Sequence, residues 1–236
     1  MNSLKHAIFQ LQEAAAQEKM NPERFFKTDV NAYAAHDRFL GVSVPTVHAV
    51  AKQFAELSHT DLQVLIQSKF NEERLLALFI LTSQYQKGSH PTKELCYKFY
   101  ITHIDHVNNW NLIDASCRDI VGAHLEHNDR SVLHRLAASD NLWKRRIAIV
   151  STWHFIRNND FEWTVMIAKT LIADSHDLIH KAVGWMLREM GGKNNTELVT
   201  FLDEHAHIMP RTMLRYAIEK FPADIRKNYL ARKKNR

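Results

Sequence analysis

A tryptophan and an aspartate lie four residues apart in the segment 108–124, NNWNLIDASCRDIVGAH. If this segment is helical, Trp110 and Asp114 share one face of the helix. An aromatic ring face attracts a cation and a carboxylate stabilises it, so the pair suits a positively charged substrate. The alternative is that Trp110 is a core side chain, as most tryptophans are, and that Asp114 is a nearby capping residue. The spacing leaves both interpretations open.

Basic residues followed by small or aliphatic residues recur along the chain. Arg74, Arg146, Lys181 and Arg215 each begin such a run, and the last three follow one another at intervals of 35 and 34 residues. Arg74 precedes Arg146 by two such periods, and Asp114 falls between them. Helix pairs that repeat every 35–45 residues or so are typical of HEAT or armadillo solenoids. The pattern therefore predicts a row of cations, interrupted by one carboxylate, along a concave surface.

A row of cations on a concave surface suits the phosphate backbone of a nucleic acid. A carboxylate among cations stays ionised, so Asp114 would act as a base or electrostatic stabiliser and not as a general acid. The alternative is that each basic residue merely lies at a helix boundary with its head group in solvent. The shared register of four residues favours the nucleic-acid interpretation.

The composition favours long helices joined by short connections. The chain has 236 residues, of which 45% are hydrophobic and 24% charged, with only six glycines and five prolines. All-β proteins need more turn residues than this. The formal net charge of +5 is a mild indication of a polyanionic partner. Two cysteines outside any CxxC pair, with neither a signal peptide nor a membrane-spanning run, predict a protein of the reducing cytoplasm.

Helical periodicity covers most of the chain, and no convincing strand pattern occurs, so the predicted fold class is all-α. The first helix is expected over residues 3–19, and the long connection 21–45 that follows it is of a length typical of functional loops. Helix caps are predicted at Thr60, Asn71 and Asp140. The other helices are expected over residues 45–57, 61–67, 72–86, 92–104, 108–124, 131–139, 141–157, 161–173, 176–191 (closed by Gly191 and Gly192), 196–206, 210–221 and 222–236.

Several segments closely resemble the bacterial DNA alkylation repair family, the HEAT-like-repeat DNA glycosylases. The connection FFKTDVNAYAAHDRFLGVSVP also resembles the N-terminal signature of that family. The resemblance extends over nearly the whole chain and implies a single domain over residues 1–236, an ARM-like α-solenoid with a concave basic groove. The segments that carry it are WNLIDASCRDIVG, NLWKRRIAIVSTWHFIR, HDLIHKAVGWMLREMG and MPRTMLRYAIEKF.

The resemblance implies a role for each matched residue. The catalytic aspartate of the family corresponds to Asp114, and its two active-site tryptophans correspond to Trp110 and Trp185. Its active-site arginine corresponds to Arg146, with Arg145 as the competing assignment. Family members excise cationic N3- and N7-alkylpurines without flipping the base into a pocket and without a metal. Related subfamilies that lack the aspartate bind DNA without catalysis, so its presence favours an enzyme.

The expected protein is a cytoplasmic, monomeric glycosylase of base excision repair that needs no cofactor. It would bind double-stranded DNA carrying alkylated purines and no membrane. The residues expected to contact DNA are Arg74, Arg145, Lys181 and Arg215. A noncatalytic solenoid scaffold that binds DNA or an acidic protein partner is the alternative, although a scaffold has no need for an acid in a basic row.

The remaining candidate residues are interpreted as structural. Fifteen histidines include no HExxH motif, and no Cys or Asp completes a ligand set, so no metal is expected. Cys117 has no histidine placed beside it in the sequence and is expected to be a packing residue. Trp143, Trp153 and Trp163 lie at apolar helical spacing and are expected in the core. The terminal ARKKNR is expected to be a frayed tail.

Overall fold

A computed structural model describes residues 3–232, and that part of the chain forms helices and no strand. Its one β-type pairing is the isolated bridge between Arg38 and Phe70. The all-α prediction is therefore confirmed, whereas the repeated solenoid stays a prediction. None of the helices formed by residues 3–232 is both long enough and apolar enough to cross a membrane.

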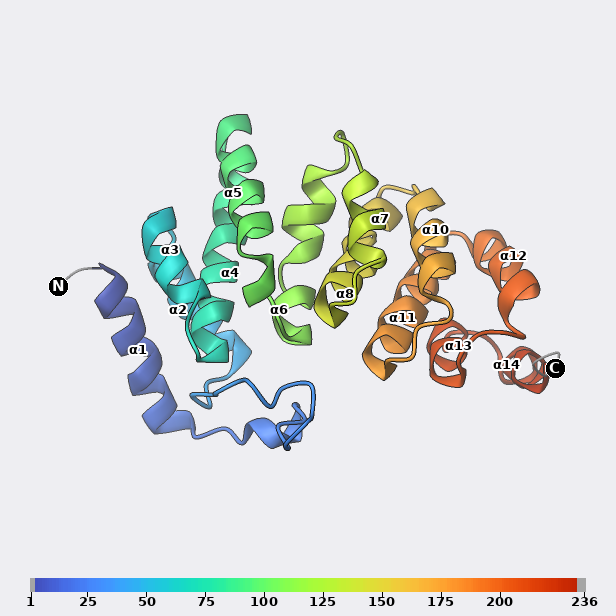
Figure 1. The fold of residues 1–236 in the computed structure, drawn as a ribbon, viewed down its shortest axis with the longest axis horizontal. Coiled ribbons are helices and arrows are strands. Elements are labelled where there is room, and N and C mark those ends of the chain that lie inside the picture. Colours follow the sequence, from blue (N-terminus) through green and yellow to red (C-terminus); the bar gives the residue numbers. More distant parts are fainter. Residues whose placement is uncertain (1–2, 233–236) are drawn as a thin grey trace. The chain divides into compact units, whose positions relative to one another are not determined.

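The chain divides into two compact units, Met1–Ser116 and Cys117–Arg236. In the first unit α4 is the central helix, packing against the helices before and after it in the sequence (Figure 1). Side chains all around α4 are buried, as expected of a helix enclosed by others. The elements of this unit are α1 (Ser3–Glu18), η1 (Pro22–Arg24), α2 (Val44–Gln53), α3 (His59–Ile66), α4 (Asn71–Lys87), α5 (His90–Thr102), η2 (Ile104–His106) and α6 (Trp110–Asp114).

In the second unit α11 has the central position and packs against five other helices. Gly184 allows α13 to approach α11 closely, because a Cβ there would lie 2.4 Å from the Met213 carbonyl oxygen. The elements of this unit are the π-helix η3 (Arg118–Gly122), α7 (Ser131–Ala137), α8 (Leu142–Ser151), α9 (Trp153–Arg157), α10 (Glu162–Leu171), α11 (Asp177–Lys193), α12 (Asn195–His205), α13 (Arg211–Ala217) and α14 (Ala223–Ala231). The single domain over residues 1–236 stays a prediction.

The connection between α1 and α2 closes on itself at its two ends. The Met20 N–H donates to the Gly41 carbonyl at 3.0 Å. Gly41 has a φ of +84°, and a Cβ there would lie 2.8 Å from the Met20 carbonyl oxygen, so only glycine fits. The Glu72 carboxylate, in the first turn of α4, accepts hydrogen bonds of 2.9 Å from the backbone N–H groups of Leu40 and Gly41. The long connection is thus an ordered element attached to the start of α4.

Several sequence-based helix boundaries are wrong. Ser58 caps α3 in place of Thr60, and Asn141 caps α8 in place of Asp140. In each case the true cap is the residue with extended backbone angles, whose side-chain oxygen then reaches the N–H groups of the first turn. Gly191 and Gly192 lie inside α11 and do not end it, since Gly191 instead leaves space for Leu198 of α12.

The segment 108–124 is not one continuous helix. α6 ends at Asp114, a turn follows at residues 115–116, and the π-helix begins at Arg118. The Ser116 hydroxyl donates to the Leu112 carbonyl at 2.6 Å, an interaction that bends helices. The expected helix over 141–157 is likewise divided, because α8 ends at Ser151 and α9 begins at Trp153.

Candidate functional site

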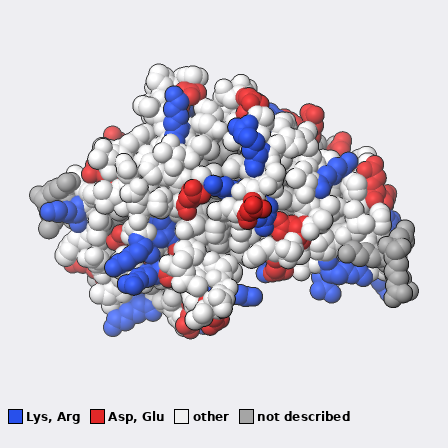
Figure 2. Space-filling view, viewed as in Figure 1, with Lys and Arg blue, Asp and Glu red and all other residues white. Residues whose placement is uncertain are grey.

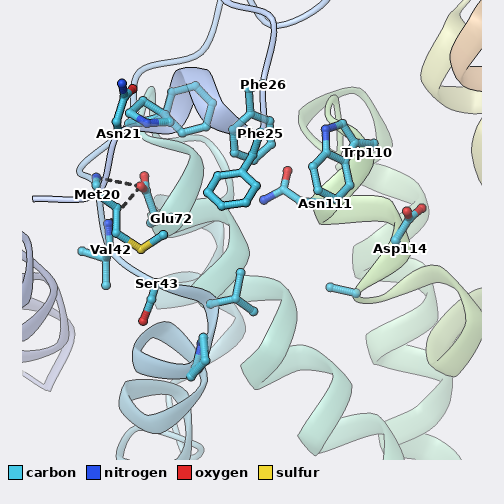
Figure 3. A pocket seen from close by; sticks show the side chains of 16 residues that line it. Met20, Asn21, Phe25, Phe26, Val42, Ser43, Glu72, Trp110, Asn111 and Asp114 are labelled. Atoms are coloured by element: carbon cyan, nitrogen blue, oxygen red, sulfur yellow. Dashed lines mark hydrogen bonds between the residues drawn. The ribbon is translucent and has the colours of Figure 1, made fainter. Parts of the chain in front are cut away.

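Trp110 and Asp114 line the same cavity of the first unit, which has a volume of about 500 Å³. Both side chains are half-buried, and both come from the short helix α6, as their four-residue spacing predicts. The opposite walls come from the two ends of the α1–α2 connection and the first turn of α4 (Figure 3). Most of the lining is aromatic or aliphatic and includes Met20, Pro22, Phe25, Phe26, Phe39, Val42, Val44 and Pro45.

Three aromatic rings of this lining form a continuous stack. The Phe26 ring lies 4.6 Å from the Phe39 ring and 5.2 Å from the Trp110 ring, with interplanar angles of 28° and 26°. Stacked rings of this kind restrain one another and favour a defined orientation. Trp110 is therefore held by the connection as well as by its own helix, and it is not simply a core side chain.

A buried carboxylate, that of Asp37, joins three parts of the first unit. Its side chain is 0% exposed and forms an ion pair with the Arg74 guanidinium. It also accepts hydrogen bonds from the side-chain amides of Asn71 at 3.0 Å and Asn109 at 2.5 Å. Asp37 belongs to the α1–α2 connection, Asn71 and Arg74 to α4, and Asn109 directly precedes α6. This cluster, called here the Asp37 network, anchors the connection to both helices.

The Asp37 network fixes the residues on either side of Trp110. Asn109 caps α6, since its side-chain oxygen accepts from the Trp110 N–H at 2.7 Å. Asn111 exchanges two side-chain hydrogen bonds with Asn71, of 2.7 and 3.3 Å. Asn71 was predicted as a helix cap, but Phe70 is the N-cap of α4 and the Asn71 amide serves this cluster instead. The orientation of the helix that carries Trp110 and Asp114 is set by these long-range contacts.

Arg74, which the sequence predicts as a DNA contact, is a buried residue of the first unit. Arg74 is only 3% exposed, and besides the ion pair with Asp37 it donates to the Ser68 carbonyl at 2.8 Å. A buried guanidinium paired in this way is unavailable to a phosphate group unless the cluster opens. The sequence gives no sign of this pairing, because Asp37 lies in a segment without helical periodicity.

The two neighbouring arginines of the second unit differ in their surroundings. Arg145 forms an ion pair with Asp174 at 2.6 Å and donates to the Ser139 and Asp140 carbonyls, so it ties α8 to two turns. Arg146 is 5% exposed and donates to the Leu178 carbonyl at 2.7 Å. Both arginines therefore make contacts within the second unit, and the assignment of Arg146 as the active-site arginine, with Arg145 as the competing assignment, stays a prediction.

The second predicted tryptophan, Trp185, lies in a half-exposed aromatic cluster. Its ring meets the Trp153 ring edge-on at 4.9 Å, and the Arg118 guanidinium lies 4.6 Å from the centre of the Trp153 ring. The Arg118 side chain is also paired with Asp119 at 2.7 Å. Trp153 was expected in the core, but it is half-buried beside Trp185. Helical spacing alone could not tell this position from a core one.

The chain matches the family model described as "DNA alkylation repair enzyme" over residues 7–221. It belongs to that family. A structure titled "Predicted DNA alkylation repair enzyme from Enterococcus faecalis" aligns with it at a TM-score of 0.67 and 17% identity, covering 89% of this chain and 96% of that one. At this identity the likeness concerns the fold alone. No curated protein sequence matches the chain.

Two of the predicted DNA contacts of this DNA alkylation repair family member lie at the surface. Lys181 is half-exposed and forms an ion pair with Asp177 one turn earlier at 2.7 Å, and Arg215 is exposed on α13. On the face drawn in Figure 2, Lys and Arg side chains gather at the lower left, and charges of both signs are interspersed elsewhere. Lys181 and Arg215 stay predicted DNA contacts.

Some of the residues that the sequence analysis interprets as structural are buried in this family member, and others are not. Cys117 and Trp143 are buried, as expected of packing residues, and neither Cys96 nor Cys117 forms a disulfide. Burial raises the pKa of the Cys96 thiol to about 11, which makes it a poor nucleophile. Trp163 is half-buried, in edge contact with His134, and is not part of the core. The expected frayed tail falls mainly on residues 233–236, outside the described residues.

Proposed function

We propose that this protein is a DNA glycosylase that excises positively charged N3- and N7-alkylated purines from duplex DNA by hydrolysing the N-glycosidic bond. The observation that carries the proposal is that Trp110 and Asp114 line one cavity in a member of the DNA alkylation repair enzyme family. An aromatic face beside a carboxylate suits a substrate whose base is cationic and whose sugar becomes cationic during the reaction.

The chemistry requires electrostatic stabilisation more than acid catalysis. A purine alkylated at N3 or N7 already carries a positive charge, so when the bond from C1′ to N9 breaks, the electron pair neutralises the departing base. The positive charge that develops on the deoxyribose is stabilised by the ionised Asp114 carboxylate. Asp114 then orients a water molecule for attack at C1′, and the attacking water releases one proton to solvent as the sugar hydroxyl forms. No metal or other cofactor is needed for these steps.

The surroundings of α6 support this role through preorganisation. A carboxylate that must act on a developing charge is most effective when its position is fixed before the reaction begins. The Asp37 network and the stack of Phe26 on Trp110 hold the helix from two sides. The proposed site thus pairs a fixed carboxylate with a fixed aromatic ring.

DNA binding is assigned to the second unit as well as to the cavity. We propose that Trp185 contacts the sugar and backbone near the lesion, that Arg146 holds a flanking phosphate, and that Lys181 and Arg215 add phosphate contacts. Such contacts bind duplex DNA with little sequence preference and with a strong dependence on salt. In this proposal the protein acts as a monomer in the cytoplasm.

The decisive experiment is single-turnover release of 7-methylguanine from methylated duplex DNA by the parent protein and by Asp114→Asn. The substitution keeps the size of the side chain but removes its charge, so excision should fall by roughly 10²–10³-fold. Binding to unmodified DNA, measured in parallel, should be kept or strengthened because an anion has been removed. A variant that excises at the parental rate would show that Asp114 is not catalytic. A parent protein that binds DNA but releases no alkylpurine would support the alternative function, that of a noncatalytic DNA-binding scaffold.

A further inference from the structure

The first turn of α11 is capped by a histidine side chain. His176 has extended backbone angles, and its Nδ1 atom accepts a hydrogen bond of 3.1 Å from the Leu178 N–H. Common N-caps such as Ser, Thr and Asn accept through an oxygen atom that does not titrate. A ring nitrogen of histidine accepts only when it carries no proton. This cap therefore exists only while the His176 ring is neutral, with its proton on Nε2.

The residue that His176 caps also holds the candidate active-site arginine. Arg146 lies on α8, which packs against α11, and it donates to the Leu178 carbonyl at 2.7 Å. Leu178 is thus bound at its N–H by the His176 ring and at its carbonyl by the Arg146 guanidinium. Whatever fixes the backbone of Leu178 also fixes one partner of Arg146.

Charged and titratable groups surround His176 on both sides of the turn. The Asp174 carboxylate accepts from the His176 N–H at 2.8 Å and pairs with Arg145 of α8 at 2.6 Å. His180, one turn into α11, donates from Nε2 to the Asp174 carbonyl at 2.5 Å. Burial lowers the pKa of His176, the nearby carboxylates of Asp174 and Asp177 oppose this, and the cations Arg145 and His180 add to it. The ring is therefore neutral at pH 7 and takes up a proton only in mildly acidic solution.

Protonation of His176 would open the cap. A protonated Nδ1 is a donor, and it would face the N–H of Leu178, which is also a donor. The positive charge on the ring would in addition lie at the N-terminal end of a helix, where the helix dipole disfavours cations. Both effects loosen the first turn of α11, which includes the carbonyl that holds Arg146.

We infer that His176 is a positioning residue for Arg146, and that it acts only while its own ring is neutral. The inference rests on the proposed function, in which Arg146 holds a phosphate that flanks the lesion. It follows that this phosphate contact weakens as the pH falls. The direction is opposite to the effect of simply adding positive charge, because protonated histidines on a DNA-binding surface strengthen phosphate binding.

The test measures affinity for duplex DNA at about pH 8 and about pH 5, on either side of the histidine pKa, at constant salt. Asn caps a helix without titrating, so His176→Asn should match the parent at the higher pH and bind about fivefold more tightly than the parent at the lower pH. His176→Ala has no cap at either pH and should bind about fivefold more weakly than the parent at the higher pH. An equal pH response of the parent and His176→Asn would overturn the inference, as would parental affinity of His176→Ala at the higher pH.

The matched control is a histidine of the same unit that caps no helix. The side chain of His127 is 86% exposed, and its ring lies 4.0 Å from the Glu126 carboxylate. His127→Asn removes one titrating ring, as His176→Asn does, and should follow the parent at both pH values. A gain in affinity at the lower pH that His127→Asn shares would assign the effect to the loss of any histidine and would overturn the inference.

A measurement without DNA distinguishes failure of this inference from failure of the proposed function. NMR follows the His176 ring, the Leu178 amide and the Arg146 Nε–H signals between about pH 8 and about pH 5. All three should shift with one midpoint in the parent, and the last two should lose that transition in His176→Asn. If they do so while the protein binds no DNA, the proposed function fails and positioning by His176 stands. An Arg146 signal that does not follow His176 would overturn the inference at any DNA affinity.

Discussion

The two units hold their candidate site residues by different physical means. In the first unit the helix that carries Trp110 and Asp114 is positioned by the Asp37 network, a set of buried hydrogen bonds and one ion pair between segments far apart in the sequence. In the second unit Trp185 lies on α11, which is held by close helix packing. Gly184, next to Trp185, lets α13 approach.

This difference predicts different responses to mutation. A buried polar cluster is sensitive to the loss of any one partner, because the remaining groups are left without hydrogen bonds in a region closed to water. A packed helix pair is sensitive to added volume at the point of contact and tolerates charge changes on its exposed face. The predictions below test this distinction.

The largest effect is expected from Asp37→Ala. The substitution leaves the Arg74 guanidinium buried without its carboxylate partner, a loss of about 3–5 kcal/mol in the free energy of unfolding. Urea denaturation measures this difference. The double variant Asp37→Ala, Arg74→Met removes both charges and should recover part of the loss. A single-variant loss below about 1 kcal/mol would show that the Asp37 network does not hold the first unit together.

Gly184→Ala tests the packing of the second unit. The added Cβ would lie 2.4 Å from a backbone carbonyl oxygen, so α11 and α13 must move apart, with a loss of about 1–3 kcal/mol in unfolding free energy. Gly192→Ala in the same helix is the matched control, because the nearest atom to its Cβ is the end of the Lys220 side chain at 3.7 Å. That control should raise stability by about 0.5–1 kcal/mol. Equal effects of the two variants in thermal unfolding would refute the close-packing argument.

Trp110→Ala and Trp185→Ala test whether the candidate tryptophan of each unit contributes to lesion binding and excision. Each variant should weaken engagement of the lesion and its excision by about 1–3 kcal/mol, as for other aromatic contacts to nucleic acids. Trp110→Ala should also lower thermal stability, since it removes one ring from the stack with Phe26. Excision at the parental rate by both variants would show that both tryptophans have a purely structural role.

Lys181→Ala and Arg215→Ala should change DNA affinity with little effect on stability. Each lost phosphate contact should make the slope of log affinity against log salt concentration shallower by about one unit. The charge-preserving Arg215→Lys is the control and should keep the parental slope. A slope near zero for the parent protein would contradict a basic DNA-binding surface.

The smallest expected effect is the dependence of the free energy of unfolding on pH, to which histidines of both units contribute. Burial lowers the pKa of His59 and His106 in the first unit and of His176 and His205 in the second. Because the unfolded chain binds these protons more readily, the free energy of unfolding should decrease as pH falls from about 7 through the unfolded pKa near 6.5. Urea denaturation at several pH values measures this. Stability that is constant or higher at pH 5.5 would contradict the prediction.

Much of the local structure followed from the sequence. Few glycines and prolines, helical periodicity and capping residues are local signals, and they located the helices to within a few residues. The four-residue spacing of Trp110 and Asp114 likewise predicted that they share a face, because helical geometry alone determines this. The interruptions after Asp114 and at Thr152 were missed, since turns and π-helices within an apolar periodic segment leave little trace in composition.

Only the tertiary structure decided the partners of polar side chains. Arg74 and Arg215 are alike in sequence register, yet one is buried against Asp37 and the other is exposed. The cavity beside Asp114 also depends on the α1–α2 connection, whose rings and backbone come from a segment without periodicity. The sequence by itself determined which residues form helices and which of them share a face. Which faces are buried, and which charges meet, depended on contacts between distant segments, because long-range pairing leaves no periodic pattern along the chain.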